Sequence, residues 1–382
     1  MTLKNTLFLL AIFFWAICAF SFIHTPKASS YSIDELRKLY SSGDNTTWPE
    51  PLLDSVVMPY YQEIGSLPEM QFPINNPFSK EKLKLGKALF FDPRLSSSKQ
   101  IACASCHDSE IAWGDGRRFS YGHDRQLGKR NAMTLFNIGY YDSLFWDGRA
   151  SSLEDQVHFP LQDSLEMQST PEIAVKHLQE IEGYKPLFQA AFGDTSINFE
   201  KIKMAIATFE RSIVSRKSKF DRFIGGDSLR FTDQEVWGLH LFRTKARCVN
   251  CHHSPLFADN KFHNTGLSYY GRKFEDLGKY NVTNNPSDVG KFRTSSLREI
   301  AVSKPYMHNG LFPHLEGVIN LYNAGMPHPK RKQHQLDDPL FPTTTDLVQE
   351  LHLADEEQEA LEAFLLTLSS RQVRERPPAF PH

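Results

Sequence analysis

Two copies of the pentapeptide Cys-x-x-Cys-His constrain this chain of 382 residues more than any other feature. The first copy contains Cys103, Cys106 and His107, and the second contains Cys248, Cys251 and His252. This pentapeptide is the attachment signature of c-type haem, because its thiols are spaced to bind one porphyrin and the adjoining histidine reaches the iron. The sequence therefore predicts two covalently bound haem c groups and redox chemistry.

A Cys-x-x-Cys pair without the histidine also suits zinc binding or thiol–disulfide exchange, and four thiolates could hold one structural zinc ion. The histidine in the same place in both copies argues against these alternatives. Of the five cysteines, the remaining one, Cys18, lies in the apolar amino-terminal segment. No pair is then left to form a disulfide.

Length and charge exclude several other classes of protein. The chain is long enough for two domains with separate cores. Its net charge of −2 provides no general attraction to nucleic acid or to an anionic membrane. A mean hydropathy of −0.42 excludes a polytopic membrane protein. We therefore expect no nucleic-acid partner.

The amino-terminal segment, residues 1–28, has the pattern of a secretory signal peptide or an uncleaved membrane anchor. Lys4 precedes an apolar run from Leu7 to Ile23. Either reading exports the rest of the chain and predicts a periplasmic protein whose membrane contact is limited to this segment.

Two halves of similar plan follow a Ser/Pro-rich linker or amino-terminal extension at 29–75, which carries one short amphipathic stretch at 33–40. Helical patterns at 81–91 and 232–244 each lead into a haem motif, and Thr232 and Glu235 can form a capping box. Gly86, Leu89 and Phe90 match Gly238, Leu241 and Phe242 at one constant spacing, which suggests a repeat.

The remaining patterns complete an all-α prediction with few short strands. Residues 199–224 have the spacing of one long amphipathic helix, which Gly225 and Gly226 end at the expected domain boundary. A last helix is expected at 355–369. The sequence thus predicts two cytochrome c-like haem domains, at 76–225 and 226–372, followed by a loose Pro-rich tail at 373–382.

From about residue 75 to residue 370 the chain resembles the bacterial dihaem cytochrome c peroxidase and MauG family. The stretches that carry this resemblance are Leu89 to Ser96, Phe145 to Ala150 with Leu153 to Gln156, and Pro305 to Gly310. The resemblance implies reduction of hydrogen peroxide to water at the first haem. Electrons would enter at the second haem from a small cytochrome c or a cupredoxin, and the resemblance leaves a homodimer open.

The resemblance also implies residues for the peroxide chemistry. Gln156 and Glu166 would line the distal pocket of the first haem and transfer the proton. His123 would be a removable distal iron ligand, with Gly122 as its hinge, and Trp146 would bridge the haems. On the residues alone, solvated loop positions for Glu166 and His123 and a core position for Trp146 stay open.

Two further groups of residues are implied. Arg149, Arg298 and His308 are candidates for pairing with haem propionates. A calcium ion between the domains would take oxygen ligands from Asn131 and from the backbone carbonyls of Ser303 and Pro305.

One position departs from the pattern of many peroxidases. Tyr322 stands where they carry the methionine that ligates the second haem, and tyrosine at this place resembles MauG, which oxidises residues of a partner protein. A thioether raises a haem's potential, whereas a phenolate favours oxidised iron. Met326 and, less favoured, Met307 are the alternative ligands.

Three hypotheses follow from these patterns. The first is a peroxidase supplied by a small redox protein, and the second is a MauG-like oxidase of a protein substrate. The third is a non-enzymatic dihaem electron carrier, against which Gln156 and Glu166 argue, because a carrier needs no acid–base pair.

Overall fold

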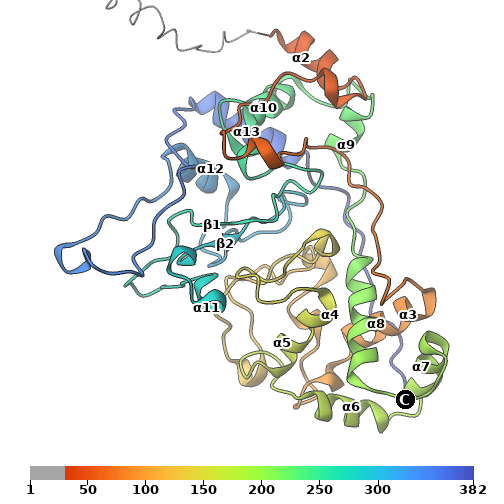
Figure 1. Ribbon diagram of the computed structural model, residues 1–382. Coiled ribbons are helices and arrows are strands. Elements are labelled where there is room, and N and C mark those ends of the chain that lie inside the picture. Colours follow the sequence, from red (N-terminus) through yellow and green to blue (C-terminus); the bar gives the residue numbers. More distant parts are fainter. Residues whose placement is uncertain (1–30) are drawn as a thin grey trace, which may run out of the picture.

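The computed structural model describes residues 31–382, so the predicted leader at 1–28 lies outside the described part. The chain forms two mostly helical lobes (Figure 1). The helices are α2 (Ile33–Tyr40), α3 (Lys80–Phe91), α4 (Leu153–Gln156), α5 (His158–Gln162), α6 (Pro171–Gln179), α7 (Tyr184–Phe192), α8 (Phe199–Arg211), α9 (Lys219–Ile224), α10 (Asp233–Arg243), α11 (Tyr280–Thr283), α12 (Leu315–Asn323) and α13 (Asp355–Leu366).

The strands β1 (Phe262–His263) and β2 (Phe292–Arg293) form one short antiparallel sheet, in which Phe262 pairs with Arg293. The expectation of a mostly α-helical fold with few short strands is confirmed. Among residues 31–382, no helix combines the length and the apolar composition that crossing a bilayer requires.

Each lobe has its own hydrophobic core. Buried side chains between residues 85 and 213 fill the first, around α3 and α8. The second core is built around α10 and α13 from residues 220–368, together with side chains of the extension. Two separate apolar cores explain why the chain divides into two lobes, since each helix buries its apolar face within its own lobe.

The repeat seen in the sequence is also a repeat of helix packing. At Gly86, on α3, an added Cβ would lie 1.9 Å from the backbone oxygen of Ala205 on α8. At Gly238, on α10, an added Cβ would lie 1.9 Å from the backbone oxygen of Ala360 on α13. In both lobes the helix that leads into the haem motif therefore crosses a later helix at backbone contact, which only glycine permits.

The helices before the two motifs begin as their sequences predict. Thr232 caps α10, and Thr232 and Glu235 form the reciprocal capping box. The Ser79 side chain accepts a hydrogen bond from the Lys82 backbone N–H at the start of α3. Helical expectations for 33–40, 81–91, 232–244 and 355–369 are confirmed to within three residues at each end.

The single long helix expected at 199–224 is instead two helices, α8 and α9. The break follows Arg211, and Ser218 restarts the helix with a capping box to Asp221. The Ser215 backbone N–H donates to the Asn137 side chain at 2.9 Å, so this stretch bonds to the first lobe and not to its own helix. Ile213 belongs to the first core and Phe220 to the second, so the change of core precedes the expected Gly225–Gly226 boundary.

The segment expected as a linker at 29–75 packs against the second lobe. Side chains between residues 36 and 64 belong to the second core. Asn250, inside the second haem motif, accepts a hydrogen bond from the Asp54 N–H at 2.7 Å and donates to the Leu52 carbonyl at 3.0 Å. Apolar burial and these bonds hold the extension over the motif.

The tail at 373–382, expected to be loose, lies along the first lobe, where the chain ends (Figure 1). The Glu375 backbone carbonyl accepts a hydrogen bond from the Ser109 hydroxyl at 3.0 Å, and the Glu375 backbone N–H donates to the same hydroxyl at 3.1 Å. The Arg94 guanidinium donates to the Pro381 carbonyl at 3.1 Å. Backbone groups of the tail therefore have protein partners that the composition of the tail did not reveal.

Substituting either crossing glycine should destabilise its lobe. We expect Gly86→Ala and Gly238→Ala each to cost about 1–3 kcal/mol of unfolding free energy, because the added methyl group forces two helix backbones apart. Urea denaturation followed by circular dichroism measures this cost. The matched control is Gly317→Ala, in α12, where an added Cβ meets nothing within 4 Å and stability should rise by roughly 0.5–1 kcal/mol. An equal effect at all three positions would contradict the close helix crossings.

Candidate functional site

The first haem motif forms a compact turn. Cys103–Ser105 is a short 3₁₀ helix, and the His107 N–H donates to the Cys103 carbonyl at 3.0 Å. The His107 Nδ1 lies 3.0 Å from the carbonyl oxygen of Trp113. Because a carbonyl can only accept, Nδ1 carries the proton, which leaves Nε2 free as a ligand.

The second motif repeats this geometry. Cys248–Asn250 is again a short 3₁₀ helix, and the His252 N–H donates to the Cys248 carbonyl at 2.8 Å. The His252 Nδ1 lies 3.0 Å from the Phe257 carbonyl oxygen. None of the four motif cysteines forms a disulfide. Both motifs therefore offer two thiols and one oriented histidine, the donor set that haem c requires.

A cavity of about 1400 Å³ adjoins the first motif. It exceeds the roughly 300–1,000 Å³ typical of small-molecule sites, so it has room for a porphyrin. The predicted site residues among its lining residues are Cys103, Cys106, His107, Asn131, Trp146, Arg149, Gln156, Glu166 and His308. Tertiary structure thus brings together nine of the predicted residues, from both lobes.

Glu166 faces this cavity from a loop after α5. Glu166 is partly buried, and burial raises its pKa, with the Asp163 charge adding to the rise and Arg149 opposing it. Gln156, the last residue of α4, lines the same cavity. A carboxyl group with a raised pKa that shares a cavity with an amide can accept and return a proton.

His123 is not among the residues that line the cavity. Its Nε2 lies 3.3 Å from the Asp124 carboxylate, and its Nδ1 is buried without a partner. Its backbone N–H donates to the Glu166 carbonyl at 2.8 Å. The His123 loop therefore rests directly on the Glu166 loop, with the imidazole turned toward Asp124.

Gly122 has a packing role beside this histidine. An added Cβ would lie 2.0 Å from the Leu165 carbonyl oxygen and 2.6 Å from the Glu166 Cα. The contact between the two loops thus requires glycine here in the observed conformation, whether or not it also acts as a hinge.

Trp146 lies at the junction of the lobes. Its indole Nε1–H donates to the Asn131 carbonyl at 3.0 Å, and its ring meets the His308 ring edge-on with centroids 6.3 Å apart. The Asn131 N–H donates to the His308 carbonyl at 2.8 Å. His308 stacks on Phe292 at 3.6 Å, and burial lowers its pKa to about 4. His308 is therefore a neutral ring that ties Trp146 to the second lobe.

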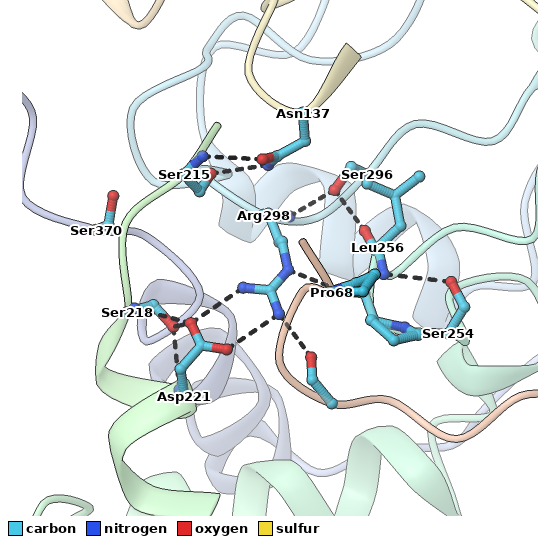
Figure 2. Close-up of polar contacts among 12 residues, drawn as sticks. Pro68, Asn137, Ser215, Ser218, Asp221, Ser254, Leu256, Ser296, Arg298 and Ser370 are labelled. Atoms are coloured by element: carbon cyan, nitrogen blue, oxygen red, sulfur yellow. Dashed lines mark hydrogen bonds and ion pairs between the residues drawn. The ribbon is translucent and has the colours of Figure 1, made fainter. Parts of the chain in front are cut away.

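The two arginines expected at propionates have protein partners. The Arg149 guanidinium bonds to Asp147 at 3.0 Å and covers the Phe145 ring at 3.5 Å. Fully buried Arg298 bonds to both carboxylate oxygens of Asp221 at 3.1 Å and donates to the Pro255 carbonyl at 2.7 Å (Figure 2). Arg298 thus has an anion inside the protein already and joins α9 to the loop of the second motif.

Glu210, which the sequence interpretation did not single out, also lines the cavity. It is 4% exposed, its Oε2 has no hydrogen-bond partner, and burial raises its pKa to about 8. Ile202, Ile206 and Glu210 are spaced four residues apart on the apolar face of α8. A glutamate in that stripe is the signal by which the sequence could have revealed it.

Tyr322 lies in the last turn of α12, close to the second motif. Tyr322 is partly buried against the second core, and burial of its phenol together with Cys251 and Cys248 raises its pKa. Met326 is buried but lies beyond the end of α12, in left-handed backbone with φ of 61°. Met326 therefore does not lie on the same helix as Tyr322. Met307 also packs against the second core.

A cluster of potential metal ligands lies beside the second motif: Cys251, Asp259 and His263 have donor atoms within 4.8 Å of one another. His263 Nε2 lies 2.7 Å from Asp259. Although burial opposes the charge, this bond and the Cys251 thiol raise the His263 pKa to about 10. The cluster therefore consists of an Asp–His ion pair next to a thiol that haem attachment would consume.

Of the predicted calcium ligands, Asn131 is held by a hydrogen bond from its own side chain, and Ser303 and Pro305 lie in a loop. The Asn131 side chain uses its Nδ2 to donate to the Arg117 carbonyl at 2.8 Å, so its Oδ1 can still face a cation. Ser303 and Pro305 flank Lys304 in a loop of the second lobe with a cis Lys304–Pro305 bond.

Haem stoichiometry tests the two motifs. We expect Cys103→Ser/Cys106→Ser and Cys248→Ser/Cys251→Ser each to reduce covalent haem from two groups per chain to one, because each thiol pair holds its own porphyrin. The pyridine haemochrome spectrum against protein concentration measures this after expression with c-type maturation. Loss of a bound zinc ion in both variants, without haem in the parent, would favour a shared zinc site.

Comparison with known proteins agrees with this geometry. Residues 80–229 match the sequence model of the family described as di-haem cytochrome c peroxidase. The chain is 35% identical to the cytochrome-c peroxidase IdrP1 of Pseudomonas sp. (strain SCT), over 80% of this chain and 85% of that protein. It is also 35% identical to the methylamine utilization protein MauG of Methylophilus methylotrophus, over 88% and 95%.

A solved structure described as a MauG-like protein associated with microbial copper homeostasis is similar with a TM-score of 0.71 and 33% identity, over 79% of this chain and 93% of that chain. The diheme peroxidase BthA from Burkholderia thailandensis shares the fold, with a TM-score of 0.64 at 22% identity, over 83% and 96%. The chain therefore belongs to the dihaem cytochrome c peroxidase and MauG family.

Proposed function

We propose that this protein is a dihaem c-type peroxidase that reduces hydrogen peroxide to water, with electrons from a small redox protein such as a cytochrome c or a cupredoxin. The observation that carries this proposal is the partly buried carboxyl group of Glu166, which shares a cavity with Gln156 and with the thiols and histidine of the first motif. Relatives named cytochrome-c peroxidase support it.

Each lobe would hold one haem c, at 76–225 through His107 and at 226–372 through His252. Bound at the first motif, the haem would supply an iron position at which peroxide can bind and be reduced. The polypeptide's part is to hold the proximal ligand, exclude bulk water and provide the proton-transfer group.

Glu166 would take the proton from one peroxide oxygen and return it to the leaving oxygen. Burial favours its neutral form and so brings its pKa closer to the working pH than that of an exposed glutamate. The Gln156 amide would orient the peroxide. His123, on the loop that contacts Glu166, would reach the iron only after its loop moves, since its ring faces Asp124.

Trp146 would pass electrons between the lobes, because its indole lies at their junction and packs against His308 of the second lobe. Asn131 fixes the indole by accepting its N–H. A calcium ion on Asn131, Ser303 and Pro305 would add a link between the lobes, and we include it, a homodimer and a periplasmic location as parts of this proposal.

A MauG-like oxidase of a protein substrate is the second candidate function. The observation that favours it is Tyr322, which is partly buried close to Cys248 and Cys251, where a phenolate ligand would favour oxidised iron. Relatives named MauG support this alternative. The cavity with its buried carboxyl groups weighs against a simple electron carrier, which needs no such proton-transfer site.

Removing the carboxyl group of Glu166 should abolish most peroxide turnover. We expect Glu166→Gln to keep both haems and lower kcat by about 10²–10⁴-fold, because the amide cannot accept the proton. Stopped-flow oxidation of a reduced small cytochrome c by peroxide measures this.

The pH profile gives a second readout of the same residue. The base works deprotonated, so activity of the parent protein should fall as the pH drops through a pKa raised above the ordinary glutamate value. That acidic limb should vanish in the variant. Glu172→Gln, at an exposed position on α6, is the control, and near-normal turnover by Glu166→Gln would refute the assignment.

Replacing Tyr322 should distinguish the two functions. If the phenolate ligates the second iron, Tyr322→Met should raise that haem's potential, because a thioether favours reduced iron. Electron paramagnetic resonance and a spectroelectrochemical titration report the ligand and the potential. Tyrosine ligation in the parent with no cytochrome oxidation would favour the oxidase, whereas unchanged spectra on substitution would remove Tyr322 as a ligand.

A further inference from the structure

The three largest fully buried side chains are arginines, and two of them are neutralised within the protein. Arg243 forms an ion pair with Glu63, and Arg298 forms one with Asp221. The third, Arg293, makes no ion pair with any carboxylate in residues 31–382, and its Nη1 is buried without a hydrogen-bond partner. A guanidinium is always charged, and an unpaired buried charge costs several kcal/mol. Residues 31–382 therefore supply no carboxylate as a counter-ion for Arg293.

The other atoms of the Arg293 guanidinium contact neutral groups. Its Nε donates to the Phe145 carbonyl at 3.1 Å, and its Nη2 lies 3.3 Å from the sulfur of Met133. Its carbon lies 3.6 Å above the Tyr141 ring. These contacts fix the plane of the guanidinium but contribute no negative charge, so only Nη1 is left to meet an anion.

The position of Arg293 lies between the two haem motifs. Its backbone N–H donates to the Trp146 carbonyl at 2.8 Å, and its neighbours Met133 and Phe145 line the cavity of the first motif. Three residues further on, the Ser296 hydroxyl donates to the Leu256 carbonyl at 2.5 Å, in the loop of the second motif (Figure 2). The strand β2 thus carries Arg293 to the junction beside Trp146.

We propose that Arg293 binds a haem propionate at this junction and thereby sets the reduction potential of the haem that carries it. A propionate is a carboxylate, and the guanidinium is the side chain best suited to bind one. Either haem could supply it, since the segment reaches toward both motifs. The proposal rests on haem attachment but not on the choice between peroxidase and oxidase.

Potentiometry of the full-length dihaem protein tests this. We expect Arg293→Gln to shift the reduction equilibrium of one haem about tenfold toward the oxidised form, which is a fall of 59 mV in potential for a one-electron couple. The reason is that the propionate charge left behind favours oxidised iron. Arg293→Lys, which keeps the charge, should recover most of that potential. The haem whose spectrum shifts is the one that supplies the propionate.

A matched control removes a buried arginine together with its own anion. Arg243→Gln/Glu63→Gln leaves the net charge unchanged, so it should lower stability and change the reduction equilibrium of either haem by less than twofold. Unchanged potentials in Arg293→Gln would overturn the proposal.

If Arg293→Gln does not fold, a crystal structure of the parent protein with its haems decides. A propionate oxygen at hydrogen-bond distance from Nη1 supports the proposal. Water, chloride or a protein group alone at that atom overturns it. Absence of haem from the parent, seen in the pyridine haemochrome spectrum, would instead mean that the proposed function fails.

Discussion

The fold depends on two helix crossings at which backbones touch. Gly86 on α3 meets α8, and Gly238 on α10 meets α13, each with no room for a methyl group. Such contact fixes the angle and the register of the helices, and each haem motif lies in the loop that follows the helix so fixed. The Nδ1–H groups of His107 and His252 each donate to a backbone carbonyl a few residues further on. In both lobes, therefore, a close helix crossing positions the haem motif.

Some buried charged residues form ion pairs within the protein, whereas others near the first motif do not. Where the core only has to be stable, buried charges find partners, as Arg298 finds Asp221. Glu166, Glu210 and Arg293, which form no ion pair within the described residues, lie around the first motif and the junction. A buried group without a partner costs stability. Its retention here fits a cavity whose occupant is not part of the polypeptide.

The two ends of the described chain reinforce opposite lobes. The extension before residue 75 bonds to Asn250 in the second motif, and the tail beyond residue 372 bonds to Ser109 beside the first. The tail starts from the second lobe and finishes on the first (Figure 1). The junction that holds Trp146 is thus spanned by the tail as well as by the segment between α8 and α9.

Local sequence by itself determined the two Cys-x-x-Cys-His motifs, the helices that precede them and the mostly α-helical class. Motif spacing, helix caps and apolar periodicity all depend on neighbouring residues. Resemblance to a family supplied Gln156 and Glu166, and the structure places both in one cavity. Only the tertiary structure decided that 199–224 breaks into two helices and that the tail is bound. Only it distinguished Arg298, paired with Asp221, from Arg293, which is not. The reason is physical: the cost of a buried charge depends on residues far away in sequence, and no local pattern records which of them lies alongside.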